Sequence, residues 1–166
     1  MNGQYIEVVC ALDHPAAEKT PFGQAVAKKA EEGGGWLTWV FSTEDLDPIE
    51  KAIGRPAIEG HRRRPDGTEL RWKQVGVKEL LTDPELPFFI KWQDGNHPST
   101  AGIQVSAISK INFANSNPLE KSALGHETLN SLSNNNITIQ VIETDLATRG
   151  ILSIEFASKS NFVSID

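Results

Sequence analysis

A short segment that recurs at a fixed distance constrains the fold of this chain more than any other feature. Residues 47–51 read DPIEK and residues 117–121 read NPLEK, so the second copy lies 70 positions after the first. Repetition on this scale is typical of a chain built from copies of one supersecondary unit. Each copy also has the composition of a helix start, with Asp or Asn as the N-cap, Pro at the first helical position and Glu at the third. We therefore expect two related units with a short helix at the same place.

Strand-like segments surround both expected helices. Apolar runs at 36–42 and 105–114 precede them, and the segments at 5–8, 89–92 and 153–156 each place a charged residue between apolar ones. Alternation of this kind puts successive side chains on opposite faces of a strand. The order strand–helix–strand–strand–strand, written βαβββ, follows for each unit. The sequence thus predicts an α+β fold with repeated βαβββ units and mixed sheets.

The length of 166 residues suits a single domain. We expect three parts within residues 1–166: an incomplete first unit at 1–35, with a strand at 4–11 and a helix at 20–32, a second unit at 36–100, and a degenerate third unit at 101–166. Hairpin turns are expected at 65–67, which read Pro-Asp-Gly, and near 144–150.

These segments resemble the glyoxalase-like domain proteins of the vicinal-oxygen-chelate superfamily. The residues that carry the resemblance are TPFGQAVAKKAEEGGGWLTWVFSTEDL at 20–46, EGHRRRPDGTELRWKQ at 59–74, LPFFIKW at 86–92 and HPS at 97–99. The resemblance implies that paired units curl their sheets into a cup. In the superfamily the cup binds a divalent metal, which stabilises negative charge on two neighbouring substrate oxygens. Members include lyases, isomerases, dioxygenases and metal-free proteins that sequester antibiotics.

The usual metal ligands of that superfamily are incomplete in this chain. The resemblance places a ligand seven residues before Asp45, where this sequence has Thr38. The closing strands offer Glu7, Lys91 and Glu155, and Lys91 repels a cation. The sequence therefore does not establish a cofactor, and a bound divalent metal remains an alternative. The candidates for its ligands are Glu7, His61 and His97.

Glu7 is the candidate catalytic residue, either as a base or as a surviving metal ligand. The alternative is a carboxylate that merely pairs with an arginine.

The arginine-rich hairpin is the candidate anion site. With 66–67 as a two-residue turn, Arg64 faces Glu69, and Arg62 faces Arg71. On that register Arg62, Arg64 and Arg71 hold a carboxylate or phosphate if they face the cup. They form an ordinary charged surface if they face solvent.

Two tryptophans are candidate walls of a ligand pocket. Trp39 and Trp92 lie in strand-like segments, where aromatic side chains also serve as plain core residues. The single cysteine, Cys10, is expected to be a small buried hydrophobe because it follows an apolar run.

Composition narrows the classes of molecule that this protein is expected to bind. The net charge of −6 provides no broad positive field, so neither nucleic acid nor an anionic membrane is expected as a partner. No apolar run reaches the length of a membrane helix, and the first residues lack a secretory pattern, so we expect a cytoplasmic protein. An incomplete first unit leaves a sheet edge unpaired, and such edges recruit another chain. A homodimer is therefore expected.

The expected function is binding of a small molecule, with a lyase or isomerase reaction on an oxygenated or carboxylated metabolite as the enzymatic form. Two alternatives stay open. One is a metal-free module of the bleomycin-resistance type that sequesters its ligand, and the other is a truncated relative that keeps only a structural or interaction role.

Overall fold

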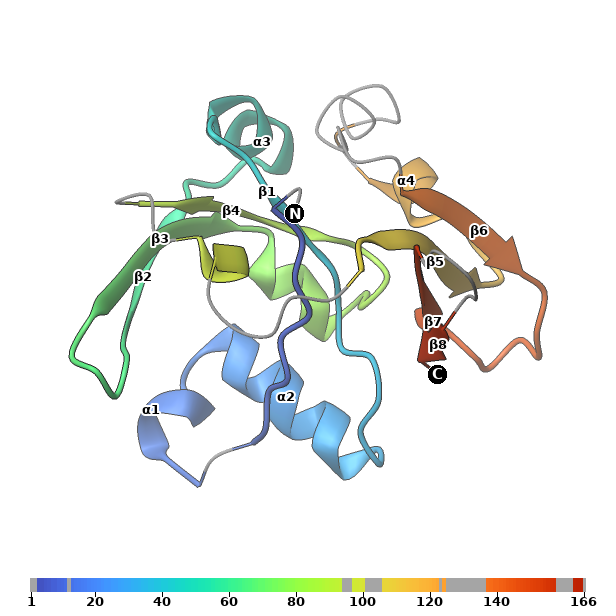
Figure 1. The fold of residues 1–166 in the computed structure, drawn as a ribbon, viewed down its shortest axis with the longest axis horizontal. Coiled ribbons are helices and arrows are strands. Elements are labelled where there is room, and N and C mark those ends of the chain that lie inside the picture. The colour runs from blue at the N-terminus through green and yellow to red at the C-terminus, as the bar shows by residue number, and fades with distance from the viewer. Residues whose placement is uncertain are drawn as a thin grey trace.

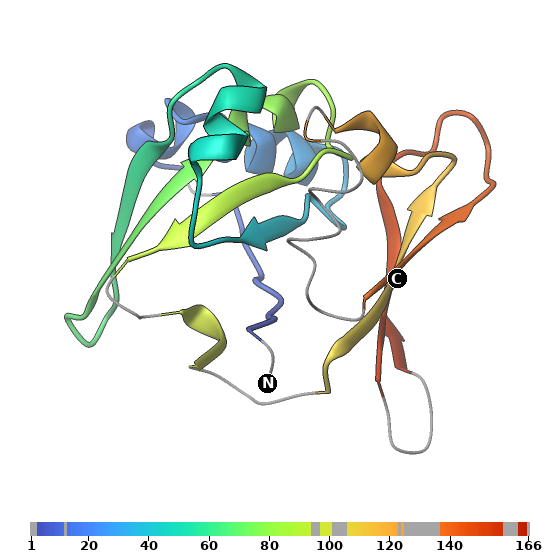
Figure 2. The ribbon, with the colours of Figure 1, turned by 90° about the horizontal axis from the view of Figure 1, so that it is seen from above.

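The fold consists of two four-stranded sheets with the N-terminal segment passing between them (Figures 1 and 2). The computed structural model describes residues 3–11, 13–93, 97–100, 106–122, 124, 137–157 and 163–165. The helix at 47–53 packs on one face of the first sheet, through Phe89, and the helix at 21–31 packs on the other, through Phe88 (Figure 1). The predicted α+β class with mixed sheets is confirmed. Among the described residues, no helix has both the length and the apolar character needed to cross a membrane.

The N-terminal part is an extended segment at 3–11 followed by helices α1 (Pro15–Glu18) and α2 (Pro21–Glu31). The predicted start of α2 is confirmed, because the Thr20 hydroxyl accepts a hydrogen bond from the Gly23 amide at 3.0 Å. Ala25 of α2 is buried against the 3-10 helix η1 (Val77–Leu81) and Phe88. The helix thus covers one end of the first sheet.

The first sheet is one complete βαβββ unit. It contains β1 (Val40–Ser42), β2 (Ile58–Arg63), β3 (Glu69–Val75) and β4 (Phe88–Trp92), and helix α3 (Asp47–Ile53) follows β1. The strand order is β1-β4-β3-β2, with β1 parallel to β4 and the other pairs antiparallel. The expected strand at 36–42 is shorter than predicted, since only its last three residues pair with a neighbour.

Helix α3 starts differently from the prediction. Its N-cap is Leu46, and Asp47 already lies in the helix. The Glu50 carboxylate accepts a hydrogen bond from the Ala57 amide at 2.6 Å instead of closing a capping box. Glu50 therefore fixes the chain between α3 and β2, a contact that the local sequence pattern does not reveal. In the second copy of the repeat, Asn117 is the N-cap as predicted, and its Oδ1 accepts from the Leu119 amide.

The second sheet keeps the order of elements along the chain but arranges the strands differently. It contains β5 (Ile108–Ala114), β6 (Thr138–Ile142), β7 (Ile151–Phe156) and β8 (Val163–Ile165), with α4 (Pro118–Lys121) after β5 and the short 3-10 helix η2 (Pro98–Thr100) before it. The strand order is β6-β5-β7-β8, so β6 and β7 lie on opposite sides of β5. The hairpin predicted near 144–150 was wrong, because the strands it joins are not neighbours.

Asn115 explains how the chain crosses from β6 to β7. This residue has a left-handed backbone with φ of 58°. Its side-chain amide donates to the carbonyls of Asp145 and Thr148, and its Oδ1 accepts from the Thr144 amide. One asparagine at the end of β5 therefore holds the crossing segment in place.

The predicted strand at 4–11 was also wrong. Residues 4–11 are extended but belong to no ladder. Alternating side chains are a property of any extended chain, whereas a strand also needs a neighbouring edge within hydrogen-bonding distance. Cys10 is exposed instead of buried for the same reason, and Val8 is 93% exposed. The three consecutive asparagines at 134–136 predict a loop, and this segment lies outside the described residues.

The buried side chains form clusters that join the two sheets. Phe89 and Leu119 share one cluster, which connects the first sheet to α4. Phe113 and Ile154 belong to another, in the second sheet, and the ring of Trp39 lies 5.3 Å from that of Phe113. Trp39 contacts both clusters and therefore lies at the junction of the sheets.

Candidate cleft between the two sheets

A large cleft lies between the sheets, with a volume of about 1780 Å³. Its walls are predominantly apolar, and α2 closes one end with Phe22 and Val26. The first sheet contributes Val40, Leu70, Trp72, Phe88 and Ile90, and the second sheet contributes Ile108, Ile111, Ile139, Ile151 and Ile154. Strand alternation explains the lining from the first sheet, because every second residue of a strand points to the same side. In the second sheet the pairing of β5 with β7 shifts register twice, so residues three positions apart, such as Ile108 and Ile111, both line the cleft.

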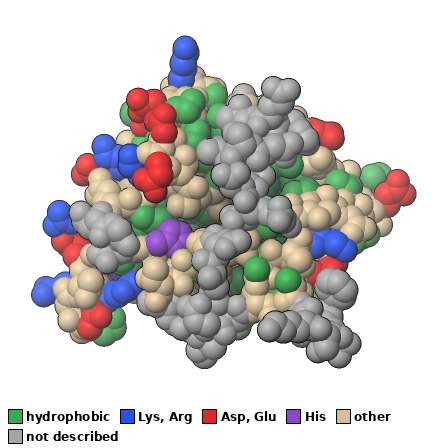
Figure 3. Space-filling model, turned by 45° about the horizontal axis from the view of Figure 1, so that its top comes forward, with side chains coloured by type: hydrophobic (Ala, Val, Ile, Leu, Met, Phe, Trp, Pro, Cys, Tyr) green, Lys and Arg blue, Asp and Glu red, His purple; other side chains and the backbone are tan. Residues whose placement is uncertain are grey.

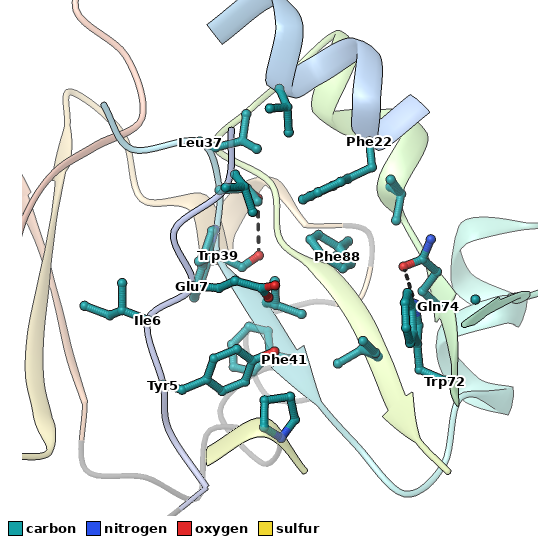
Figure 4. A pocket seen from close by; sticks show the side chains of 18 of the residues that line it. Tyr5, Ile6, Glu7, Phe22, Leu37, Trp39, Phe41, Trp72, Gln74 and Phe88 are labelled. Atoms are coloured by element: carbon teal, nitrogen blue, oxygen red, sulfur yellow. Dashed lines mark hydrogen bonds between the residues drawn. The ribbon is translucent and has the colours of Figure 1, made fainter. Parts of the chain in front are cut away.

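The N-terminal segment runs through the cleft. Tyr5 and Glu7 point from it toward β1 and β4, whereas Ile6 points the other way (Figure 4). Gln4 accepts a hydrogen bond from the Ile108 amide at 2.8 Å, which ties the segment to the second sheet. Arg62 Nη1 donates to Glu7 Oε1 at 3.2 Å, which ties it to the first. Within the described chain, no backbone–backbone hydrogen bond holds residues 3–11.

Tyr5 carries the aromatic ring of this segment and is half-buried. Burial raises the pKa of its hydroxyl, the nearby Glu7 carboxylate raises it further, and Arg62 acts in the opposite direction. The hydroxyl therefore stays protonated at neutral pH. The Tyr5 ring meets the His97 ring edge to face, with centroids 5.6 Å apart.

The arginine hairpin has a register one residue away from the predicted one. Arg62 faces Leu70, Arg63 faces Glu69, and His61 faces Arg71. The predicted two-residue turn was wrong, because residues 64–68 lie between the strands and the pairing of Arg64 with Thr68 leaves three residues, 65–67, in the turn. Gly67 adopts a left-handed φ of 87°, and the Arg64 amide donates to the Thr68 carbonyl. Such a three-residue turn shifts the pairing by one position. The side chains of β3 that were expected to share a face with Arg62 and Arg64 therefore lie on the opposite face.

The register separates the three arginines that the sequence grouped together. Arg62 lines the cleft, while Arg64 lies in the turn beyond it. Arg71 does not line the cleft, and its Nε donates to the Glu69 carboxylate at 2.9 Å. Only Arg62 of the three is therefore placed to contact a ligand in the cleft.

A row of rings follows one wall of the cleft. The Trp72 and Trp92 centroids lie 5.6 Å apart, and Trp92 lies 6.0 Å from His97. Trp72 is fixed by a hydrogen bond from its Nε1 to Gln74 at 2.9 Å (Figure 4). Its ring lies over Gly60, where a Cβ would come within 2.4 Å of it.

Gly60 and Gln74 are site residues that the sequence reasoning missed. A signal for the glycine existed, because a glycine inside a strand marks the close approach of another group. Both tryptophans predicted as walls, Trp39 and Trp92, line the cleft. Trp39 also donates from its Nε1 to the Glu85 carbonyl at 2.8 Å, so it has a structural role as well.

The candidate metal ligands do not come together. Glu7 pairs with Arg62, and His61, although it borders the cleft, has its Nδ1 3.8 Å from the Glu69 carboxylate. His97 bonds through Nδ1 to the Ser99 hydroxyl at 2.7 Å, and burial lowers its pKa. Among the residues that the structure describes, no three His, Cys, Asp or Glu side chains are placed to share a metal ion.

The ligand positions implied by the family resemblance fit a metal no better. Thr38 lines the cleft where the resemblance places a ligand, but Lys91 donates to the Glu44 carbonyl, away from the cleft. Glu155 is hydrogen-bonded to Asn112 and paired with Lys110. The described residues therefore do not form the metal centre of the superfamily.

Charges of both signs are distributed over the surface. On the face shown in Figure 3, positive and negative side chains lie interspersed around the rim, with hydrophobic side chains between them. This pattern agrees with the small net charge of −6. On this face the described side chains therefore form no broad patch of a single sign.

Comparison with protein families gives a match over most of the chain. The family of glyoxalase-like domains matches residues 1–129, which is more than three quarters of the chain. No curated protein and no solved structure matches the chain.

Proposed function

Because the chain belongs to the family of glyoxalase-like domains, we propose that it binds a small molecule in the cleft between its two sheets. The supporting observation is the cleft itself, with a volume of about 1780 Å³ and mostly apolar walls. The cleft is larger than the roughly 300–1000 Å³ of a common ligand site, but it shares the combination of apolar walls with a few polar groups. Here the apolar walls surround the Arg62 guanidinium and the Glu7 carboxylate.

We propose binding without a resident metal, as in the sequestering members of the superfamily. The scattered positions of Glu7, His61 and His97 support this form, because chelation needs several donors directed at one point. Affinity then comes from apolar contact, at about 25 cal/mol per Å² of area removed from water.

A lyase or isomerase reaction on an oxygenated or carboxylated metabolite is the second candidate. It is favoured by the position of Glu7, whose carboxylate lines the cleft beside Arg62. In such a reaction Glu7 would accept a proton from the substrate, and Arg62 would stabilise the resulting anion. Release of a proton or a change in the absorbance of a candidate substrate, lost in Glu7→Gln, would favour this form.

The binding proposal is tested with a neutral, environment-sensitive fluorophore titrated into the purified protein. Val40 and Val141 form a matched pair, since both are 40% exposed but only Val40 lines the cleft. We expect Val40→Glu to weaken binding by about ten-fold or more, since a carboxylate in an apolar site costs several kcal/mol unless it is paired. Val141→Glu should leave the affinity unchanged. Equal affinity of all three proteins, or no binding at all, would contradict the proposal and favour a purely structural role.

Metal analysis separates the two candidate functions further. We expect the purified protein, incubated with Ni²⁺, Zn²⁺ and Mn²⁺ and then desalted, to retain far less than one metal ion per chain. Retention of one ion per chain would contradict the metal-free form of the proposal.

We also propose a homodimer in the cytoplasm. Edge strand β6 exposes Val141 and Ile142, and edge strand β2 exposes Ile58, which supports pairing with a second copy. The free, exposed Cys10 is suited to a reducing compartment. Analytical ultracentrifugation measures the mass, and a single species of 18.2 kDa at all concentrations would contradict the dimer.

A further inference from the structure

We infer that the Glu7 carboxylate occupies an anion subsite of the cleft, and that the ligand bears a carboxylate which replaces Glu7 on Arg62. This inference rests on the proposed function, because it names the chemical class of the ligand that the cleft receives. The ligand would consist of an apolar, flat body and one carboxylate group.

Arg62 is placed to recognise such a ligand. On β2 it faces Leu70 of β3, a residue that is 1% exposed, so its stem lies against an apolar surface. Of the arginines in the described parts of the chain, Arg62 is the one that lines the cleft. A guanidinium offers two parallel donors that match a carboxylate in planar geometry.

Glu7 uses only part of what Arg62 offers. A single contact joins Arg62 Nη1 to Glu7 Oε1 at 3.2 Å, and the two side chains are 57% and 45% exposed. Exposed pairs of this kind contribute little to stability because water competes for both charges. A ligand carboxylate that accepts two hydrogen bonds from Arg62 would therefore displace Glu7 at small cost.

The segment that carries Glu7 is suited to such an exchange. Its anchor on the second sheet is the hydrogen bond between Gln4 and the Ile108 amide, three residues before Glu7. A change in the Glu7 rotamer releases Arg62 without breaking that anchor. The displaced carboxylate then moves to solvent, which its present 45% exposure already makes accessible.

The neighbouring rings explain why the body of the ligand is flat. Trp72 lies on the same face of the hairpin as Arg62, two positions from the partner of Arg62 on β3. Its ring rests on Gly60 and is fixed by Gln74, so it presents a rigid apolar surface. A flat ring system joined to a carboxylate would contact Trp72 with its body and Arg62 with its charge.

The experiment uses two probes that share one apolar body, 2-naphthoic acid and 2-naphthamide. Calorimetry measures the affinity of each for the full chain, and the ratio of the two affinities is the quantity of interest. We expect the wild-type protein to prefer the acid, and Glu7→Gln to raise this preference by about two- to five-fold, because an exposed pair competes only weakly. Arg62→Met should lower the preference by about ten-fold, the effect of losing a charge-assisted hydrogen bond.

Arg63→Met is the matched control, because Arg63 is the next residue on β2 but faces away from the cleft, opposite Glu69. It should leave the preference unchanged. If both probes bind with equal affinity in every variant, the inference is overturned while the proposed function stands. If Glu7→Gln lowers the preference for the acid, Glu7 assists binding and the inference is also overturned. If neither probe binds, the proposed function itself fails, and the inference fails with it.

Discussion

The carboxylate of Glu85 lies at the contact between the two sheets, and its replacement should measurably weaken the fold. Glu85 is only 2% exposed, yet it receives hydrogen bonds from Lys121, Ser116 and Arg149. Glu85 precedes β4 of the first sheet, whereas the three donors belong to the second unit. One buried charge therefore holds the two units together.

The surroundings of Glu85 set the size of the expected loss in the free energy of unfolding. Burial opposes ionisation of Glu85, but the hydrogen bonds from Lys121, Ser116 and Arg149 outweigh it and lower the pKa from 4.5 to about 2. At roughly 1.4 kcal/mol per pKa unit, this corresponds to about 3 kcal/mol in favour of the charged form. The Lys121 and Arg149 side chains are 35% and 52% exposed, so water replaces part of what they lose. We therefore expect Glu85→Gln to lower the free energy of unfolding by about 2 kcal/mol at pH 7.

The same pKa predicts a dependence of stability on pH. Because the folded-state pKa lies below the unfolded value, the stabilisation by Glu85 is complete above pH 4.5 and is lost as the pH falls toward 2. Wild type should lose this contribution in that window, and Glu85→Gln should show a flatter profile there.

Urea denaturation followed by tryptophan fluorescence at pH 7, 4 and 3 measures both effects. A loss of about 2 kcal/mol should also lower the melting temperature by about 4–8 °C for a chain of this size. Glu69→Gln is the control, since Glu69 pairs with Arg71 on the exposed outer face of the hairpin; its effect should be much smaller. Unchanged stability of Glu85→Gln at pH 7, with the wild-type slope between pH 4.5 and 3, would refute the reasoning.

Three further substitutions test the cleft and its supports. Gly60→Ala forces the Trp72 ring to move, because a Cβ would lie 2.4 Å from it; we expect a shifted tryptophan emission and several-fold weaker binding of the neutral fluorophore, and an unchanged spectrum would contradict the packing. Gly76→Ala should cost about 1–3 kcal/mol in urea denaturation, because Gly76 has a φ of 96° and its Cβ would lie 3.2 Å from Phe88 Cα; stability within error of wild type would show that the turn relaxes. Arg71→Ala should leave the calorimetric affinity for 2-naphthoic acid unchanged, because Arg71 faces away from the cleft; a lost affinity would restore the predicted anion site of the hairpin.

Sequence reasoning located the elements whose determinants lie within a few residues of one another. Asn117 caps its helix as predicted, and Thr20 caps the helix predicted at 20–32, since a cap depends only on the next two or three amides. The segment at 65–67 was likewise recognised as a turn from its own residues. The repeat correctly indicated two strand–helix–strand–strand–strand segments in the order of the chain.

The candidate site was predicted only in part, because its geometry depends on register. The sequence placed Glu7, Arg62 and Trp92 among the site residues, and all three line the cleft. It also grouped Arg62 with Arg71, which the observed pairing puts on opposite faces. The turn holds one residue more than predicted, and this shifts the pairing of the two strands by one position.

What the sequence by itself determined are the caps, turns and alternating segments, because neighbouring residues fix them. Only the tertiary structure decided that residues 4–11 lie between the sheets instead of within one, and that β6 and β7 flank β5. It also decided that Glu85 meets Lys121 and Arg149 across the units. These features depend on partners far away in the chain, and an extended segment or a lone carboxylate has the same local sequence whichever partner it finds.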